Sequence, residues 1–450
     1  MDIKKTIYLP IEIKNRELFG HLFLAFIAIQ RGYRVILGNK SNMYKSIDTK
    51  DYKAGVLIYK GGGRSPELLS GLKEKLERIC ILDQELGVAV RDLRVFFEGR
   101  YDPSVIKYID RFYLLGKRFA DASINYAQIA PEKLCVTGWP RTDVWQQTGI
   151  WESHVNKLKE TYGNFILYSS DFGTLTRQDV EQRAKRATKW THVKDKRRYL
   201  EHKKQNEMRL NEFTTMVEHI KALALRDDIP LIIVRPHYSE NFKAWHEALQ
   251  DVQGVKVINE GSISPWLIAS EALLHSGCTT AFEAQLLGKK SAYFTDTVYS
   301  VGQAYTLEVS KPLTNLGEFL EWMKGYSNNQ VAEIDTNQVY MEGDFAAIKI
   351  IDDLDTFDLK PEKTPPKPTV SRFVRLGRHM PEFLKNTYRF LMFVYKNPGL
   401  LPLADYRQKM PGGISVVECQ SFLNSINEQQ LEISVSLLEK DLISIEMKKN

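Results

Sequence analysis

The stretch Leu231-Ile232-Ile233-Val234-Arg235-Pro236-His237 begins as an unbroken aliphatic run and ends in a polar turn. Such a short run is typical of a strand buried on both faces, as in a parallel sheet. A second unit of this kind follows, Leu273-Leu274-His275-Ser276-Gly277-Cys278-Thr279-Thr280, in which a small polar turn leads into a predicted helix. Ligands of open α/β sheets bind outside the carboxyl ends of the strands, so both turns belong to one predicted ligand site.

Strand and helix signals alternate through the first third of the chain. Strands are expected at 6–9, 34–37, 54–58, 78–82, 111–115 and 133–136, with helical apolar spacing over 16–30. This alternation is typical of a parallel sheet covered by helices. It predicts a Rossmann-like domain over residues 1–147, which would be the acceptor domain if the chain has the GT-B architecture.

A second series of strands is expected at 164–168, 231–234, 255–258, 272–274 and 291–294. It predicts a second Rossmann-like domain over 148–359, which would be the nucleotide-sugar domain of a GT-B architecture, with a charged helical insertion at about 176–226. A Pro-rich linker, 360–370, and a basic-aromatic helical extension, 371–450, follow. The expected fold class is therefore α/β: two doubly wound parallel-sheet domains with an interdomain cleft, which is the architecture of GT-B glycosyltransferases and sugar-nucleotide epimerases.

The composition is that of a globular protein. Of 450 residues, 43% are hydrophobic and 26% are charged, and no uncharged apolar run approaches the roughly 18 residues of a membrane span. The four cysteines are widely spaced, without Cys or His neighbours at ligand spacing. We therefore expect a cytoplasmic protein without a structural metal, a disulfide framework or a cofactor.

Positive charge is unevenly placed along the chain, whose net charge is +6. Residues 371–397 hold six Lys or Arg and one acidic residue, interleaved with aromatic side chains. That mixture is typical of contact with an anionic membrane, which would place the protein peripherally at the inner face of the cytoplasmic membrane. The alternative is that this segment packs on the body of the protein. No nucleic-acid motif accompanies it, so a nucleic-acid partner is not expected.

The two turns carry the donor groups that an anionic ligand needs. Arg235 and His237 suit a phosphate or carboxylate. At the second turn the candidates are hydroxyls, a glycine that permits close approach, and a carboxylate for ribose hydroxyls: Ser276, Gly277, Thr279, Thr280 and Glu283. A simple helix N-cap would need only one of them.

Two further clusters follow predicted strands. Ser169-Ser170-Asp171 ends the first strand of the second domain, where Asp171 is a candidate nucleophile, base or transition-state stabiliser; the alternative is that it caps the next turn. In the first domain, candidates for the acceptor side are Arg16, Glu17, Asp83 and Glu85. Either carboxylate could equally lie in a loop where it is only solvated.

Six motifs in this order resemble the bacterial surface carbohydrate biosynthesis proteins, over about residues 1–345. They are Ile11–Leu18, Arg31–Gly38, Asp83–Glu85, Thr137–Asp143, Arg235–His237 and His275–Ala284. That group is similar to the retaining Kdo transferases of capsule and O-antigen assembly, which have a GT-B fold and use CMP-activated ulosonic acids. The resemblance implies a nucleophilic role for Asp171 and a CMP-sugar site at His237 and 276–280. The His-Pro order of that group is replaced here by Pro236-His237-Tyr238.

The expected function is a metal-independent glycosyltransferase of surface polysaccharide assembly. It would transfer an ulosonic acid such as Kdo from a CMP donor to a glycan or lipid-linked acceptor. The chain also resembles CDP-polyol phosphotransferases of the teichoic-acid type. A sugar-nucleotide epimerase and a non-catalytic sugar-nucleotide-binding scaffold are further alternatives.

Overall fold

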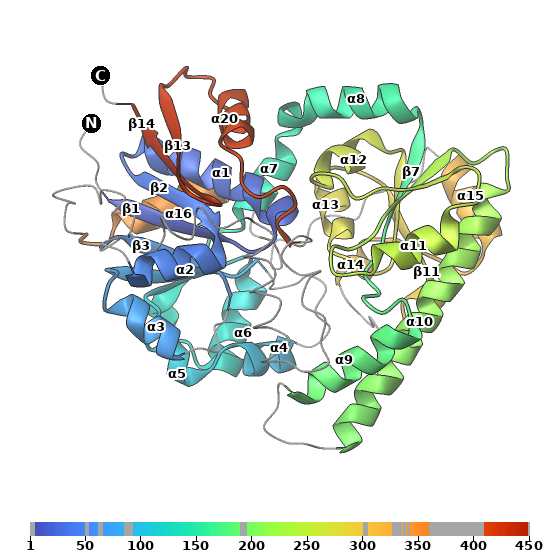
Figure 1. The fold of residues 1–450 in the computed structure, drawn as a ribbon, viewed down its shortest axis with the longest axis horizontal. Helices are drawn as coiled ribbons and strands as arrows, with labels where there is room; N and C mark the ends of the chain where they lie inside the picture. Colours follow the sequence, from blue (N-terminus) through green and yellow to red (C-terminus); the bar gives the residue numbers. More distant parts are fainter. Residues whose placement is uncertain are drawn as a thin grey trace, which may run out of the picture. The chain divides into compact units, whose positions relative to one another are not determined.

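A computed structural model describes residues 5–49, 54–61, 66–84, 93–189, 196–299, 305–325, 335, 339, 343–359 and 409–448. The chain divides into two compact units, each built on one sheet (Figure 1). Unit 1 comprises Met1–Gln84, Phe97–Arg141 and Tyr340–Asn450; unit 2 comprises Glu85–Phe96 and Thr142–Val339. The predicted α/β class with two doubly wound parallel sheets is confirmed. The predicted linker 360–370 and the segment 371–397 lie outside the described residues.

Unit 1 holds an eight-stranded sheet in the order β13-β14-β2-β1-β3-β4-β5-β6. Its parallel strands are β1 (Thr6–Ile11), β2 (Arg34–Asn39), β3 (Val56–Tyr59), β4 (Arg78–Leu82), β5 (Arg111–Leu114) and β6 (Leu134–Val136). The accompanying helices are α1 (Lys14–Gln30), α2 (Lys40–Thr49), α3 (Pro66–Lys73), α4 (Leu93–Arg100), α5 (Pro103–Ile106), α6 (Lys117–Ala127) and α7 (Pro140–Gln146). Strands β2 and β3 pair with opposite sides of β1, so right-handed connections place α1 and α2 on opposite faces.

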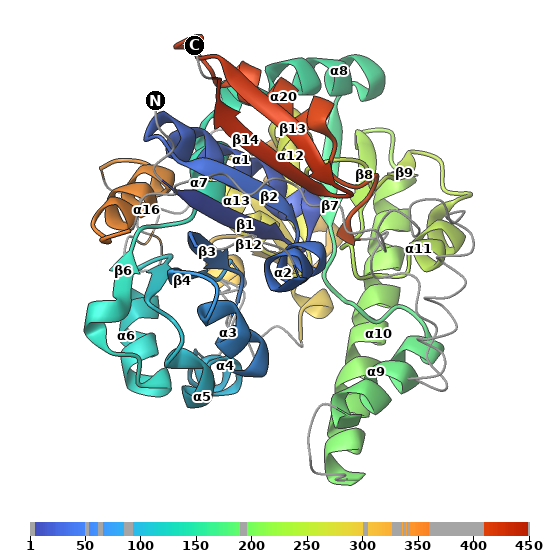
Figure 2. The same cartoon turned by 60° about the vertical axis from the view of Figure 1, so that its left-hand side comes forward.

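The C-terminal part of the chain completes this same sheet. Helices α16 (Ala346–Asp355) and α20 (Val416–Ser425) pack on α1, and the hairpin β13 (Ile433–Glu439) and β14 (Leu442–Met447) lies beside β2 (Figure 2). The sequence predicts a helical extension for 371–450, whereas 433–447 forms two strands. The physical reason is local, because apolar β-formers flank a turn in which Asp441 has φ 59°, and β14 then pairs antiparallel with β2.

Unit 2 holds a six-stranded sheet in the order β12-β11-β10-β7-β8-β9. The strands are β7 (Phe165–Ser169), β8 (Leu231–Arg235), β9 (Val255–Val257), β10 (Ala272–His275), β11 (Ser291–Phe294) and β12 (Lys311–Leu313). The helices are α8 (Glu152–Tyr162), α9 (Arg177–Lys189), α10 (Lys196–Ala224), α11 (Phe242–Leu249), α12 (Ser264–Ala269), α13 (Thr280–Leu286), α14 (Tyr305–Glu308) and α15 (Leu316–Lys324). Helices α9 and α10 pack together in the stretch where the sequence predicts a charged insertion.

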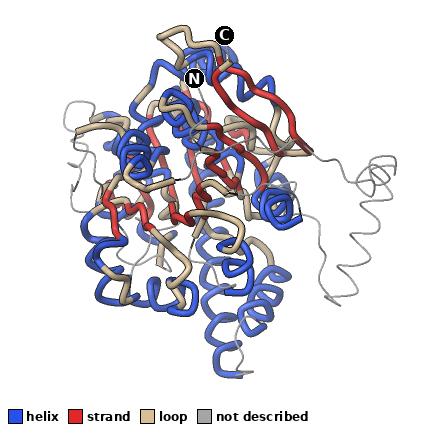
Figure 3. The backbone as a smooth tube through the Cα atoms, turned by 90° about the vertical axis from the view of Figure 1, so that its left-hand side faces the viewer, coloured by secondary structure: helices blue, strands red, loops and turns tan. Residues whose placement is uncertain are grey.

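Helices and strands alternate in both units (Figure 3), and the core of unit 2 is rich in aromatic rings. Phe213 of α10 packs edge-on against Trp245 of α11, with ring centroids 4.8 Å apart, and Phe172 packs against both. This cluster fixes the loop after β7 to two helices. None of the described helices is both long and apolar enough to cross a membrane.

Replacing Gly38 with alanine tests how closely the C-terminal hairpin covers β2. An added Cβ would lie 2.1 Å from the carbonyl oxygen of Asp441 and 2.5 Å from the Leu442 side chain. Overpacking of this kind lowers the free energy of unfolding by about 1–3 kcal/mol, which urea denaturation followed by circular dichroism would measure.

Gly71→Ala is the matched control, because its Cβ would meet nothing within 4 Å. In the helix α3 this change should stabilise by about 0.5–1 kcal/mol. Equal stability of Gly38→Ala and the wild type would contradict the close packing of β14 on β2.

Candidate functional site

The predicted donor residues lie where the connections of the unit 2 sheet reverse direction. The chain leaves β7 toward β8 and later returns to the other side of β7 as β10. Doubly wound sheets bind ligands at the carboxyl ends of strands at such a reversal. The loops at Ser169–Asp171, Arg235–His237 and Ser276–Thr280 all begin at this edge.

Hydrogen bonds join the ends of β7 and β10 directly. The Ser169 and Thr280 hydroxyls lie 3.2 Å apart, and the buried Ser276 hydroxyl lies 2.7 Å from that of Tyr168. The Ser276 amide also donates to the Ser169 carbonyl at 3.2 Å. Ser276 therefore holds the two strand ends together, while the half-buried Thr279 and Thr280 stand at the start of α13.

His275, which the sequence analysis did not select, shapes the turn after β10. Its buried ring accepts the Gly277 amide at Nδ1 (3.0 Å), and its Nε2 lies 2.9 Å from the Ser310 hydroxyl. Burial lowers the pKa of His275 to about 3, so the ring is neutral at pH 7. The predicted ligand residue Gly277 thus directs its amide at His275 and has the positive φ (82°) that glycine tolerates. Glu283 is buried one turn into α13.

A hydrogen bond also joins the ends of β7 and β8. The His237 amide donates to the Ser170 hydroxyl at 3.1 Å, and both Asp171 and His237 are half-buried. The Ser239 amide donates to Nδ1 of His237 at 3.3 Å, a geometry that puts the ring proton on Nε2. His237 can therefore offer an Nε2–H to an anion.

Arg235 is placed differently from the expected phosphate ligand. Its two terminal nitrogens donate to the carbonyls of Glu260 (2.6 Å) and Gly261 (3.0 Å), and the guanidinium lies over the Trp266 ring. Burial lowers the pKa of Arg235 to about 10, against the opposing effect of Glu260. This geometry favours an anchor for the loop before α12 over a direct ligand contact.

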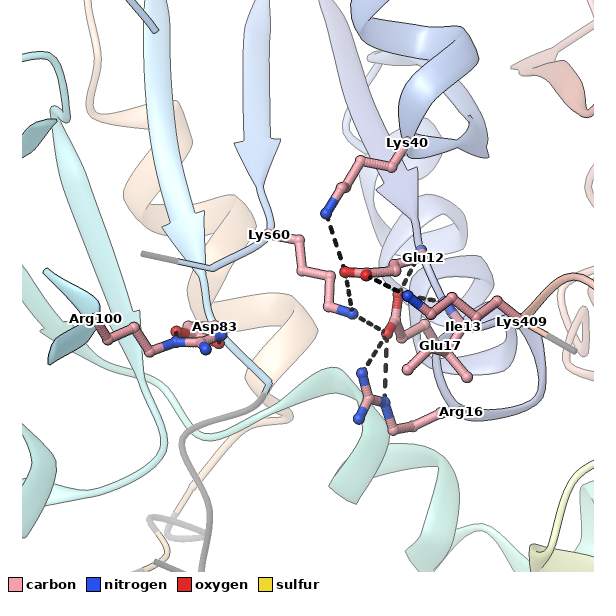
Figure 4. A network of polar contacts seen from close by, with 9 residues as sticks. All are labelled: Glu12, Ile13, Arg16, Glu17, Lys40, Lys60, Asp83, Arg100 and Lys409. Carbon is pink, nitrogen blue, oxygen red and sulfur yellow. Dashed lines mark hydrogen bonds and ion pairs between the residues drawn. The ribbon is translucent and has the colours of Figure 1, made fainter. Parts of the chain in front are cut away.

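A second cluster lies at the corresponding reversal of the unit 1 sheet, after β1, β2 and β3 (Figure 4). Three lysine ammonium groups lie 3.0–3.2 Å from the Glu12 carboxylate: Lys40, Lys60 and Lys409. The Lys60 ammonium also contacts Glu17 at 2.6 Å. These lysines and Glu12 were not predicted, because nothing in the sequence indicates that residues so far apart in the chain meet.

Glu17, a predicted acceptor-side residue, is completely buried within this network. Its carboxylate accepts the amides of Glu12 (2.9 Å) and Ile13 (3.4 Å) and pairs with Arg16 at 2.9 Å. Burial alone would raise the pKa of Glu17, but the charges of Lys60 and Arg16 outweigh it and lower the pKa to about 2. Burial also acts to raise the pKa of Glu12, but the three lysines outweigh burial and hold that pKa well below its usual range. Both carboxylates stay ionised at pH 7.

The remaining acceptor-side candidates are Asp83 and Glu85. Asp83 is buried and accepts hydrogen bonds from the Arg100 guanidinium and from the Tyr101 hydroxyl, the latter at 2.9 Å. Glu85 lies outside the described residues.

The buried ring of His21, one turn after Glu17, has a pKa lowered to about 4, chiefly by burial, and is neutral at pH 7. The described residues contain no cluster of side chains suited to hold a metal ion.

Comparison with known proteins places the fold. No protein-family model matches this chain, and no curated protein matches it. A UDP-GlcNAc 2-epimerase of Methanocaldococcus jannaschii, solved with UDP-GlcNAc and UDP, is similar over 78% of this chain and 100% of its own, at 11% identity and a TM-score of 0.50. The Neisseria meningitidis UDP-GlcNAc 2-epimerase covers 78% and 99%, at 11% identity and 0.48. The wall teichoic acid polymerase TagF covers 72% and 79%, at 10% identity and 0.44. The fold is GT-B-like.

Glu17→Gln tests the unit 1 network. The change leaves the cations around position 17 without their buried anion, so we expect a loss of about 3–5 kcal/mol in the free energy of unfolding at pH 7. The folded pKa of about 2 lies below the ordinary 4.5. The stabilisation from Glu17 is therefore complete above about pH 4.5 and is lost as the pH falls toward about 2.

Urea titrations of wild type and Glu17→Gln across this pH range give the measurement. The difference in the free energy of unfolding between wild type and Glu17→Gln should narrow as the pH falls. The control Glu160→Gln, at an exposed carboxylate, should keep a free energy of unfolding close to that of the wild type throughout. A gap that stays constant down to pH 2 would show that the charge of Glu17 does not stabilise the fold.

Proposed function

We propose that this protein is a glycosyltransferase of bacterial surface polysaccharide assembly that takes its sugar from a nucleotide donor. The observation that carries the proposal is the convergence of three loops at one sheet edge in unit 2. Hydrogen bonds link Ser170 to the His237 amide and Ser169 to Thr280. A candidate nucleophile, an Nε2–H donor and two hydroxyls thereby belong to one constellation.

Each group has a defined role in this proposal. The Asp171 carboxylate attacks the anomeric carbon, the bond from that carbon to the donor phosphate breaks, and the nucleotide leaves with the electron pair. The acceptor hydroxyl oxygen then bonds to the anomeric carbon, the bond from that carbon to the Asp171 carboxylate breaks, and the hydroxyl proton passes to water. His237 binds the phosphate or the sugar carboxylate, Thr279 and Thr280 bind the nucleotide, and Glu283 takes the ribose hydroxyls.

Two considerations support a nucleotide sugar as the donor. The M. jannaschii epimerase, which shares the fold, was solved with UDP-GlcNAc and UDP. The sequence motifs around His237 and 276–280 resemble those of enzymes that use CMP-activated ulosonic acids. We therefore propose CMP-linked ulosonic acid, such as Kdo, as the donor. Hydrogen-bond donors of the protein can bind the single phosphate of this substrate without a metal ion.

The acceptor is proposed to bind at the unit 1 reversal, around Arg16 and the cluster at Glu12. Side chains of Glu12, Lys40 and Lys409 are each between 26% and 33% exposed there. Charged groups that are partly open to solvent suit a polar glycan or a lipid-linked sugar.

A donor screen tests the proposal. CMP-Kdo, CDP-glycerol and UDP-GlcNAc are each incubated with the protein and a bacterial envelope lipid extract as the source of acceptor. We expect CMP release from CMP-Kdo that depends on the extract. Asp171→Asn keeps the side-chain size but removes the nucleophile, so turnover should fall at least about 10³-fold.

Asp228→Asn, a change at an exposed surface ion pair, is the control and should keep wild-type turnover. Turnover of CDP-glycerol alone would identify a polyol phosphotransferase instead. Isomerisation of UDP-GlcNAc without any acceptor would identify an epimerase. A protein that turns over no donor and whose cellular role survives Asp171→Asn would be a scaffold.

We further propose that residues 371–397 hold the protein at an anionic membrane. The test keeps the chain at full length, because a truncation near Lys360 would also remove β13 and β14 from the unit 1 sheet. The variant replaces the six basic residues of the segment by glutamine: Arg372, Arg375, Arg378, Lys385, Arg389 and Lys396.

Co-sedimentation with phosphatidylserine-containing vesicles is the measurement. Each basic residue near an anionic surface contributes about 1 kcal/mol, so the variant should lose nearly all binding. A control variant, in which six Lys or Arg residues within 177–204 are replaced by glutamine, should still bind the vesicles. Equal sedimentation of the 371–397 variant and the wild type would refute membrane contact through this segment.

A further inference from the structure

Glu240 is a buried carboxylate that neither the sequence motifs nor the proposed chemistry uses. It lies between β8 and α11, and its side chain is 1% exposed. Four donors converge on it. One oxygen accepts the amides of Phe172 (2.7 Å) and Gly173 (3.0 Å), and the other accepts the Ser170 hydroxyl and the Trp245 indole N–H (2.8 Å).

Three of these four donors belong to the loop that carries Asp171. The carboxylate thus holds the side chain directly before the candidate nucleophile and the backbone directly after it. The fourth donor, Trp245, belongs to the aromatic cluster with Phe172 and Phe213, so the loop is tied to the unit 2 core. Hydrogen bonds to an ionised acceptor are among the strong ones in proteins.

The same carboxylate connects the Asp171 loop to the His237 loop. The Ser170 hydroxyl donates to Glu240 and accepts the His237 amide at 3.1 Å. The Glu240 amide in turn donates to the His237 carbonyl at 2.9 Å. These bonds form a closed ring through Glu240, Ser170 and His237, so the two loops cannot move independently while it is intact.

Arg209 of α10 holds the opposite side of the loop backbone. Its guanidinium donates to the carbonyls of Asp171 (3.3 Å) and Phe172 (3.0 Å). The amides of the loop thus point at an anion and its carbonyls at a cation. Arg209 belongs to the charged helical insertion. The sequence of that insertion, taken alone, indicates only a solvated helical face.

We propose that Glu240 and Arg209 are positioning residues that clamp the Asp171 loop and set it against His237. The inference rests on the proposed function, because it assigns these residues to the reaction that Asp171 would carry. Neither residue contacts the reacting atoms. Their effect is to fix where the carboxylate of Asp171 stands, and small misplacements of a reacting group slow turnover strongly.

Glu240→Gln is the main variant. Glutamine has one acceptor oxygen and one NH2 group, so two of the four donors would face another donor. In the ligand-free protein we expect faster hydrogen exchange of the Phe172 and Gly173 amides, measured by NMR. With CMP-Kdo and acceptor we expect kcat to fall roughly 10- to 100-fold, with little change in KM. Arg209→Met, which keeps the aliphatic length but loses both loop bonds, should lower kcat in the same way.

Glu247→Gln is the matched control, because it makes the same chemical change at an exposed carboxylate of the same helix, α11. It should change neither amide exchange at 172 and 173 nor kcat. The clamp is overturned if exchange at these amides is unchanged in Glu240→Gln, or if Glu247→Gln lowers kcat as much as Glu240→Gln does.

The two readouts separate this inference from the proposed function. Amide exchange needs no donor, so it decides whether Glu240 orders the loop even where no donor is turned over. Absence of turnover in the wild type would count against the proposed transferase. Intact exchange protection in Glu240→Gln would count against the clamp alone.

Discussion

In each unit the backbone that follows the central strand is held by one buried carboxylate. After β1 the amides of Glu12 and Ile13 donate to Glu17, and after β7 the amides of Phe172 and Gly173 donate to Glu240. A strand that ends inside a doubly wound sheet leaves amide groups that have no strand partner and little water. An ionised acceptor within the fold satisfies several of them at once, and the loops of both candidate sites depend on it.

The two units stabilise these buried carboxylates with different kinds of partner. Glu17 is surrounded by cations, with Lys60 and Arg16 in direct contact. Glu240 is surrounded by neutral donors, namely two amides, a hydroxyl and an indole N–H. Neutral dipoles fix direction through geometry, whereas cations also set the local potential. The Asp171 loop of unit 2 is therefore held mainly by the geometry of neutral hydrogen bonds, whereas the corresponding edge of unit 1 carries charge.

Much of the fold could be predicted because its signals are local. Aliphatic runs such as 231–234 and 272–274 lie within the observed strands β8 and β10, and the turn residues after them mark the carboxyl edge of the sheet. The hairpin β13–β14 escaped prediction because its place depends on pairing with β2, some 400 residues earlier in the chain. Short β12 was missed as well, since the three residues Lys311–Leu313 carry no periodic pattern.

The candidate site could be predicted by position but not by contact. Sequence reasoning selected Arg235 for its charge, yet its guanidinium faces the carbonyls of Glu260 and Gly261. It passed over His275, Glu240 and Arg209, because a lone histidine, glutamate or arginine has no signature until its partners are known. Which side chains face a ligand and which face the backbone is decided by tertiary contacts, and these pair residues far apart in the chain.

The pairing of β14 with β2 also has a consequence for how the protein is made. On the ribosome, β1 to β6 emerge early, but the outer side of β2 has no strand partner until residues near 447 have left the exit tunnel. Unit 2 is complete in sequence before that moment. The nascent chain thus carries an open sheet edge for most of its synthesis, and such edges invite pairing with other chains.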